Sequence, residues 1–293
     1  MKRRLIFFLT LTLAILLTFA SCIQMPSEPP AETTGSFTPM QNVTPEELHV
    51  YLNTSYVYHS LVDETLLTTG LSPAYLILAN KTSTLSSSYK PSDLVDLRRD
   101  VVIDSSTLQL ERRAAEALYQ MMKELRADGY DDLLVTSAFR TYSNQVSLFN
   151  TYMEREQSGF SKEAIACLGV DYLRANYYEQ NKTGLSPADA RRVVLSYSAA
   201  PGTSEHQTGL CVDFVSTTLG DVLDESFEDT AVFDWLAENA YKFGFILRYP
   251  KDKVEITGYT YEPWHYRFVG REAATDIHFS GLSLEEYLLA VQQ

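Results

Sequence analysis

The sequence has few cysteines and a deficit of basic residues, and each shortage excludes a class of protein. Its 293 residues include 3 cysteines, too few for a disulfide scaffold or a multi-cysteine zinc ribbon. Acidic residues outnumber basic ones 38 to 24, giving a net charge of −14, which argues against a general nucleic-acid binder because such proteins need a basic surface. The HExxH and GxSxG patterns of common zinc peptidases and serine hydrolases are also absent. An apolar content of 45% nevertheless allows a sizeable core.

The first residues carry a targeting pattern. Three basic residues at positions 2–4 precede an uncharged, largely apolar run over residues 5–20, which is the order of a secretory signal peptide. The run is shorter than the ~20 residues that span a bilayer as a helix. Its end, Ala20-Ser21-Cys22, resembles a bacterial lipobox and predicts cleavage after residue 21 with lipidation of Cys22. The alternative is ordinary cleavage with an incidental cysteine, and both interpretations predict export to the outer face of the cytoplasmic membrane or the cell wall.

The rest of the chain divides into a tether and one globular domain. Residues 22–44 are rich in Pro, Ser, Thr and Glu without an apolar period, which predicts a flexible tether. Residues 45–293 mix helical and strand patterns without a regular βαβ period, so we expect one α+β domain with a small sheet flanked by helices. The charged stretch at about 154–200 is expected to be a helical insertion, forming either a wall of a substrate cleft or a surface excursion.

Hydrophobic periodicity and turn residues predict the individual elements. Short apolar runs predict strands over 75–80, 132–136, 210–215, 245–248 and 264–269. Helical spacing predicts helices over 108–125, 144–152 (with Ser143 as N-cap) and 233–243, and a final helix to about 291 opened by a Ser283–Glu286 capping box.

Two short clusters hold the residues most suited to catalysis. The chain has five histidines, and two of them, His206 and His265, stand near the carboxylates Asp213 and Glu262. Two histidines and one carboxylate bind catalytic zinc and leave a position for water, whose pKa zinc lowers to about 7. A second carboxylate can then transfer the proton. Histidines at the surface or in structural hydrogen bonds show the same spacing. These residues alone therefore do not decide whether the protein binds a metal ion.

Three motifs in order resemble one known family. The chain reads Ser204-x-His206-x-x-Gly209-x-Cys211-x-Asp213, then Glu262-Pro263-Trp264-His265, after an upstream segment SAFRTYSNQ at 137–145. This pattern resembles the LAS-type metallopeptidases, most closely the VanY-like D-alanyl-D-alanine and L,D-carboxypeptidases of bacterial cell walls. The resemblance covers roughly residues 75–290 and implies the LAS (hedgehog/D-Ala-D-Ala metallopeptidase-like) fold with one zinc ion per chain.

The resemblance also implies roles for individual residues of the metal centre. His206, Asp213 and His265 would be the zinc ligands. Glu262 would be the general base that takes a proton from water and later protonates the leaving amine. Gly209 would allow a tight approach of the backbone in the ligand loop.

Substrate contacts are implied for three further side chains. Arg140 would sit near the scissile carbonyl or the substrate carboxylate, since its guanidinium offers a fixed fork of donors. Gln145 and Ser204 would add hydrogen bonds to the substrate terminus. We therefore expect a monomeric, exported zinc carboxypeptidase that removes terminal D-alanine from peptidoglycan stem peptides. D,D- and L,D-specificity both stay open, as do a cross-link endopeptidase of the same fold and a non-catalytic wall-binding lipoprotein.

One position departs from the family pattern within the ligand motif. Cys211 stands where relatives usually have alanine, two residues before Asp213, so both would share one face of a strand. Three interpretations remain open from the sequence: a fourth, soft metal ligand, a buried small hydrophobe, or a disulfide partner of Cys167 in an exported protein.

Overall fold

The computed structural model describes residues 56–67, 72–103, 107–220 and 222–291. The predicted signal peptide over 1–21, the tether over 22–44 and the lipidation site at Cys22 lie outside these ranges and stay predictions. Among the described residues, none of the helices combines the length and the apolar character needed to cross a bilayer.

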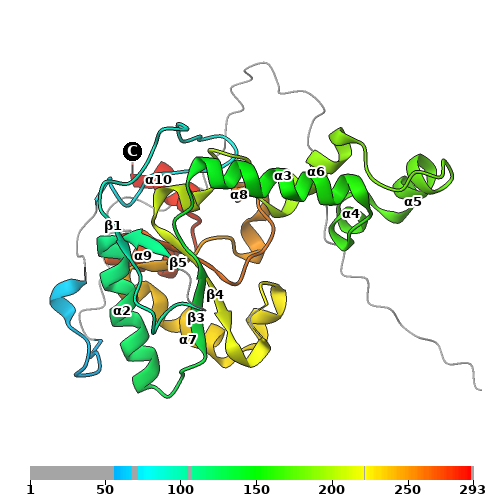
Figure 1. The fold of residues 1–293 in the computed structure, drawn as a ribbon. Helices are drawn as coiled ribbons and strands as arrows, with labels where there is room; N and C mark the ends of the chain where they lie inside the picture. Colours follow the sequence, from blue (N-terminus) through cyan, green and yellow to red (C-terminus); the bar gives the residue numbers. More distant parts are fainter. Residues whose placement is uncertain (1–55, 68–71, 104–106, 221, 292–293) are drawn as a thin grey trace, which may run out of the picture.

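A four-stranded antiparallel sheet forms the centre of the fold (Figure 1). Its strand order is β3-β4-β6-β5, so β4 and β6 are the inner strands, and every residue of β4 is buried. A separate two-stranded sheet pairs β1 with β2. Helices pack around the four-stranded sheet, which confirms the predicted α+β class. The strands are β1 (Leu94–Asp96), β2 (Gln109–Glu111), β3 (Leu133–Ser137), β4 (Cys211–Ser216), β5 (Phe245–Leu247) and β6 (His265–Phe268).

The helices also follow the prediction in most places. The helix expected over 108–125 begins later, because residues 109–111 pair as β2 and the Glu111 carboxylate then caps the helix by accepting from the N–H groups of Arg113 and Ala114. Helix α3 is capped by Thr141 and not by Ser143. The longer helices are α2 (Arg112–Ala127), α3 (Tyr142–Ser158), α4 (Lys162–Leu168), α6 (Pro187–Tyr197), α7 (Ala231–Asn239), α9 (Arg271–Ser280) and α10 (Leu284–Val291).

Short helical turns fill several of the connections. Two are four-residue α-helical segments, and one is a π-helical turn that continues α5. The others are 3₁₀ segments of three to five residues. They are α5 (Val170–Leu173), α8 (Val254–Thr257), the π-turn Arg174–Tyr178, and the 3₁₀ segments Glu64–Leu66, Glu205–Thr208, Thr217–Leu219, Glu225–Asp229, Ala240–Phe243 and Lys251–Lys253.

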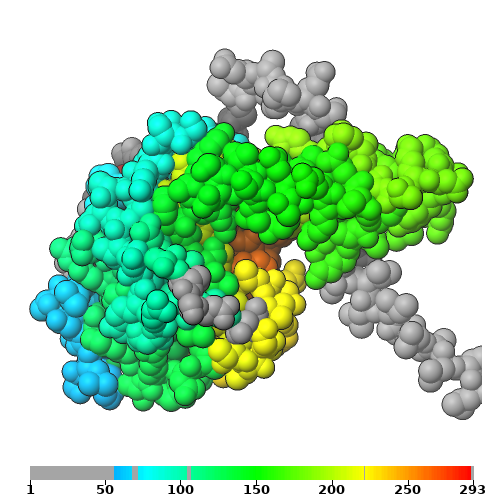
Figure 2. Space-filling view, in the orientation of Figure 1, coloured from blue at the N-terminus to red at the C-terminus, as the bar shows by residue number. Residues whose placement is uncertain are grey.

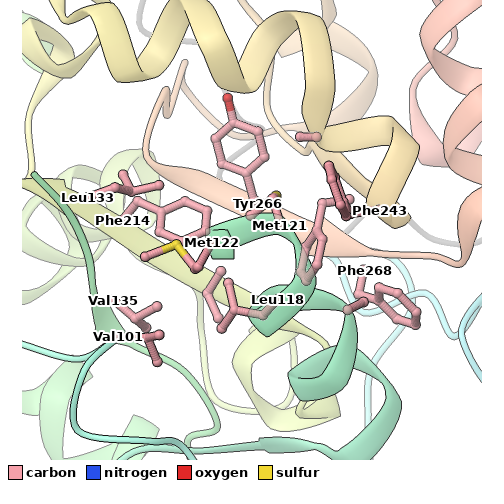
Figure 3. Close-up of a cluster of buried hydrophobic side chains, with 14 of the residues drawn as sticks. Val101, Leu118, Met121, Met122, Leu133, Val135, Phe214, Phe243, Tyr266 and Phe268 are labelled. Atoms are coloured by element: carbon pink, nitrogen blue, oxygen red, sulfur yellow. The ribbon is translucent and has the colours of Figure 1, made fainter. Parts of the chain in front are cut away.

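Helix α2 packs its apolar face on the sheet and builds the main core (Figure 3). Leu118, Met121 and Met122 of α2 belong to one buried cluster with Phe214 of β4 and Phe268 of β6. Each fully buried side chain of this size contributes roughly 1.5–3 kcal/mol of hydrophobic stabilisation. The cluster therefore fixes β4 and β6, the two strands that carry the predicted metal ligands.

The strand predicted over residues 75–80 is wrong. These residues belong to no strand, because a side chain satisfies their carbonyl groups: the Arg267 Nη2 atom donates to the Tyr75 carbonyl at 2.9 Å and to the Ile77 carbonyl at 2.7 Å. The run resembled a strand because it is short and apolar and ends at a turn residue, Asn80.

The stretch over residues 154–200 is helical, as expected. Together with the end of α3, its helices α4, α5 and α6 project from the body of the molecule (Figure 1). A small apolar cluster of their own, including Ala164, Leu173 and Val193, holds them together. Whether this stretch is an insertion relative to similar proteins stays a prediction.

The C-terminal part contains one confirmed helix start and one missed helix. The capping box of α10 forms, since the Ser283 N–H donates to the Glu286 carboxylate at 2.7 Å and the Glu286 N–H donates to the Ser283 hydroxyl at 3.2 Å. Helix α9 was not predicted, although Gly281 ends it in the left-handed conformation with φ of +66° and is the sequence signal that marks its end.

Candidate metal centre

The three predicted zinc ligands lie at one end of the two inner strands. His206 belongs to the 3₁₀ turn that precedes β4, and Asp213 on β4 stands directly opposite His265, the first residue of β6. Gly209 links the turn to the strand with φ of +67°. An added Cβ there would lie only 2.9 Å from a Leu94 methyl group, so the expected tight approach of the backbone is confirmed.

Asp213 bridges the two imidazole rings. Its Oδ2 atom is 3.1 Å from His206 Nε2, and its Oδ1 atom is 2.9 Å from His265 Nδ1. All three side chains are buried. The arrangement thus turns one nitrogen of each ring toward the same carboxylate, which is the donor set of a catalytic zinc site with two histidines and one carboxylate.

A hydrogen bond on its outer side fixes the orientation of the His206 ring. His206 Nδ1 lies 2.6 Å from the Ala138 carbonyl oxygen, which can only accept, so Nδ1 carries the hydrogen and donates. The lone pair of a neutral ring is then on Nε2, on the side of Asp213. Metal-binding histidines are usually held in this way by a backbone carbonyl or carboxylate.

Charge interactions keep protons on these rings when no cation is bound. Burial disfavours a charged His206, but the neighbouring Cys211 and Asp213 outweigh this effect and raise its pKa to about 9. Burial likewise opposes ionisation of Asp213, yet His206 and His265 hold its pKa well below the usual range. A metal ion must therefore displace protons from the cluster.

Cys211 is a free, buried thiol beside the same two rings. One donor atom each from His206, Cys211 and His265 lie within 4.8 Å of one another. Because the thiol is free, the disulfide between Cys211 and Cys167 that the sequence left open is excluded. The other two interpretations of Cys211, a soft metal ligand and a small buried hydrophobic side chain, both agree with its position.

Glu262 lies at the edge of the ligand cluster, on the segment that leads into β6. Its Oε2 atom is 3.8 Å from His265 Nδ1. Burial raises the pKa of its carboxyl group to about 7, and the nearby His265 opposes this only in part. A carboxyl group of this pKa can both accept and return a proton near neutral pH, and a bound cation would favour its ionised form.

Arg140 follows β3 and is held in place by two side chains. Its Nη1 atom donates to Gln145 Oε1 at 2.8 Å, and its Nη2 atom donates to the Ser137 hydroxyl at 2.9 Å. The amide nitrogen of Gln145 in turn donates to the Ala199 carbonyl at 2.7 Å. Gln145 is thus engaged within the protein at both ends of its amide, and its predicted contact with substrate stays a prediction.

The predicted zinc ligands, the predicted base Glu262 and the three predicted substrate-binding residues all line one cleft of about 830 Å³. Figure 2 shows the molecule hollowed between α3 and the segment that follows β4, with residues near position 260 at the bottom. Side chains of the helical stretch 154–200 form part of its far wall. The lining includes Arg140, Gln145, Tyr152, Lys162, Tyr197, Ser204, His206, Asp213, Glu225, Tyr261, Glu262, Trp264 and His265.

The importance of Glu205 was not predicted from the sequence. This carboxylate is buried, and its Oε1 atom accepts from Arg248 Nε at 2.9 Å and from Arg267 Nη1 at 2.7 Å. Burial opposes its ionisation, but the two arginines hold its pKa well below the usual range. The only sequence signal is the place of Glu205 next to a ligand, because both arginines are distant in the chain.

Comparison with known proteins agrees with this site. Residues 107–271 match the VanY family, described as D-alanyl-D-alanine carboxypeptidase. The putative carboxypeptidase YodJ of Bacillus subtilis (strain 168) is 36% identical over 220 residues, which are 74% of this chain and 68% of that protein.

Two solved structures share the fold. The LdcB LD-carboxypeptidase aligns with a TM-score of 0.58 and 33% identity, covering 76% of this chain and 93% of LdcB. A variant of the vancomycin-resistance D,D-pentapeptidase VanY, solved in complex with Zn(II), aligns with a TM-score of 0.54 and 34% identity, covering 73% of this chain and 99% of that protein. With the family match spanning more than half of its length, this chain belongs to the VanY family of D-alanyl-D-alanine carboxypeptidases.

Proposed function

We propose that this protein is a zinc-dependent carboxypeptidase that removes terminal D-alanine from peptidoglycan stem peptides. The observation that carries the proposal is the Asp213 carboxylate between one nitrogen of His206 and one of His265, with Glu262 3.8 Å from His265. The Zn(II) complex of a VanY relative supports the choice of metal.

The residues of this chain divide the chemistry among them. His206, Asp213 and His265 would hold the zinc ion. Zinc would polarise the scissile carbonyl and lower the pKa of a bound water molecule to about 7. Glu262 would take the proton from the attacking water and deliver it to the nitrogen of the departing D-alanine. Arg140 would donate to the developing oxyanion or to the terminal carboxylate of the peptide.

The terminal carboxylate distinguishes a carboxypeptidase substrate from an internal peptide bond. Arg140 is partly buried in the cleft wall, and a charge-assisted pair between its guanidinium and a carboxylate is stronger than a neutral hydrogen bond, so pairing with Arg140 would favour peptides with a free C-terminus. The relatives include both a D,D-pentapeptidase and an LD-carboxypeptidase. We therefore propose D-alanine as the product, and the choice between the D,D- and the L,D-bond is made by the experiment below.

The place of action is also part of the proposal. The basic, apolar and small-residue order of the first 22 residues supports export and lipidation of Cys22, and the following tether would let a monomeric domain reach the wall. Labelling cells with a radioactive fatty acid tests this: the wild-type protein should take up label and the Cys22→Ser variant should not. Equal labelling of both would contradict the anchor.

Release of free D-alanine is the direct test of the activity. The purified protein from residue 42 onward would receive zinc and either muramyl pentapeptide or muramyl tetrapeptide, each with a chelator control. Chelator-sensitive release from pentapeptide alone identifies a D,D-carboxypeptidase, and release from tetrapeptide alone an L,D-carboxypeptidase. Zinc binding at one ion per chain without release from either peptide would overturn the proposed activity.

A further inference from the structure

The outer nitrogen of His265 faces a buried carboxylate. His265 Nε2 lies 3.7 Å from Glu205 Oε2. Both atoms are buried, and neither has a hydrogen-bond partner at normal distance in the described part of the chain. His265 Nε2 is a potential donor and Glu205 Oε2 is an acceptor, and they face each other. A small movement of either side chain would bring them within hydrogen-bond distance.

The other side of the ring shows why this pair matters. His265 Nδ1 is 2.9 Å from Asp213 Oδ1, so the lone pair that meets a metal ion is the one on Nδ1. A neutral imidazole that binds through Nδ1 carries its only hydrogen on Nε2. In this buried site the Nε2–H group requires an acceptor, and Glu205 Oε2 is the carboxylate oxygen placed to serve.

Two arginines hold Glu205 in position. Arg267 also donates to the carbonyls of Tyr75 and Ile77, and Arg248 makes a two-pronged contact with Glu285 at 2.9 and 2.6 Å. Both guanidinium groups reach the same oxygen of Glu205, Oε1. Oε2 is therefore left free to face His265, and the carboxylate cannot rotate without breaking these contacts.

We propose that Glu205 is a positioning residue of the metal centre: it accepts the Nε2 hydrogen of His265 and thereby keeps Nδ1 available to the metal ion. This inference depends on the proposed zinc centre. It assigns no contact between Glu205 and the substrate or the metal. Its effect passes entirely through the orientation and tautomer of one ligand.

The Glu205→Gln variant tests the proposal because the arginines dictate the orientation of the new amide. Arg248 and Arg267 both donate, so the amide oxygen must stay on their side and the NH₂ group must face His265. Zinc binding at Nδ1 then brings the Nε2–H group against a second donor. We expect zinc affinity, measured by competition with a chromogenic chelator, to fall by about 10- to 100-fold.

Glu285→Gln is the matched control. It weakens a partly buried ion pair of the same Arg248 and leaves the contact between Glu205 and His265 in place, so it should lower stability and leave zinc affinity within about twofold of wild type. Glu205→Asp keeps the charge on a shorter side chain and should restore part of the affinity. Equal zinc affinity in wild type and Glu205→Gln would overturn the positioning role, whereas failure of the wild type to bind zinc would overturn the proposed function instead.

Nuclear magnetic resonance of the zinc-loaded wild type provides a test that needs no variant to fold. The nitrogen shifts of His265 should show the hydrogen on Nε2, with a downfield and slowly exchanging proton signal from its bond to Glu205. A hydrogen on Nδ1, or an Nε2 proton in fast exchange with water, would contradict the proposal. The Co(II)-substituted Glu205→Gln protein should in addition show a shifted ligand-field spectrum, while Glu285→Gln should not.

Discussion

Glu262 and Arg140 line the same cleft but are prepared for their roles in different ways. Burial gives Glu262 its pKa of about 7, so the surroundings of this carboxyl group matter more than any single partner. Arg140 depends instead on hydrogen bonds, since Gln145 and Ser137 each hold one of its terminal nitrogens. Substitution at these two places should therefore affect catalysis differently.

Replacing Glu262 by glutamine should strongly lower turnover and leave the proposed metal site in place. The amide cannot take a proton from water, and general acid–base catalysis contributes roughly 10²- to 10⁴-fold to rates. We expect kcat for D-alanine release to fall within that range, with zinc bound as in wild type. Glu255→Gln, on the exposed surface of nearby α8, is the control that should keep full activity. Wild-type turnover in Glu262→Gln would assign the base to another group.

Replacing Gln145 by leucine should remove one of the two hydrogen bonds that orient Arg140. A hydrogen bond to a charged group contributes roughly 1.5–3 kcal/mol, so we expect kcat/KM to fall about 10- to 100-fold. Steady-state kinetics on the preferred stem peptide measures this. The control is Gln120→Leu, a buried glutamine of α2 that accepts from the Asp63 N–H far from the cleft. If both variants lost activity equally, the loss would reflect stability and not the orientation of Arg140.

The limits of sequence prediction are visible at the residue scale in Glu205. His206, Asp213, His265 and Glu262 stand in short motifs, so their spacing along the chain reveals them. The partners of Glu205 are Arg248 and Arg267, at separations of 43 and 62 residues. Both are fully buried, and a charged side chain in or next to a strand gives no sign that it turns inward. Such a network becomes visible only in three dimensions.

Elements were predictable where the side-chain pattern itself decides the conformation. The inner strands β4 and β6 contain enough valine and aromatic residues to be recognised, and α10 carries its capping box in four residues. The segment 75–80 has an apolar pattern too, but the guanidinium of Arg267 satisfies its backbone in place of a neighbouring strand. Helix α2 begins later than predicted because residues 109–111 form backbone hydrogen bonds with β1 and not within a helix.

The turn that joins His206 to β4 gives a prediction at the scale of the element. Gly209 and Gly220 both have positive φ, but an added Cβ meets Leu94 and Pro91 at Gly209 and open space at Gly220. The left-handed conformation costs an alanine roughly 1–2 kcal/mol, so Gly220→Ala should lose about this much. Gly209→Ala should lose more and should also bind zinc more weakly, because the ligand loop must shift.

Denaturant unfolding and zinc competition on these two alanine variants separate backbone strain from displacement of the turn. The free energies of unfolding would be compared in the presence of chelator, so that metal binding does not contribute. Equal losses in the two proteins, with unchanged zinc affinity in both, would show that the close contact at Gly209 does not position His206.

At the scale of the whole molecule, the proposed metal centre is connected to distant parts of the chain. His265, one of its proposed ligands, faces Glu205. Glu205 accepts from Arg267, which also contacts the 75–77 segment, and from Arg248, which also contacts Glu285 in the first turn of α10. The three proposed ligands are buried, one on the turn before β4 and two on the inner strands, and they are brought together only when β4 and β6 pair. Zinc binding and folding of the domain should therefore be strongly linked.

Removing zinc should lower the thermal stability of the entire domain. A ligand present at about 1,000 times its Kd stabilises the native state by roughly 4 kcal/mol, and for a domain of this size each kcal/mol shifts Tm by roughly 2–4 °C. We expect chelation to lower Tm by about 10 °C and added zinc to restore it, as measured by calorimetry. Magnesium should not substitute, because it prefers oxygen ligands. His206→Ala should lose the zinc-dependent shift. His278→Ala, which removes a ring stacked on Tyr241 outside the cleft, should keep it. A zinc-dependent shift that survived in His206→Ala would place the stabilising ion elsewhere in the molecule.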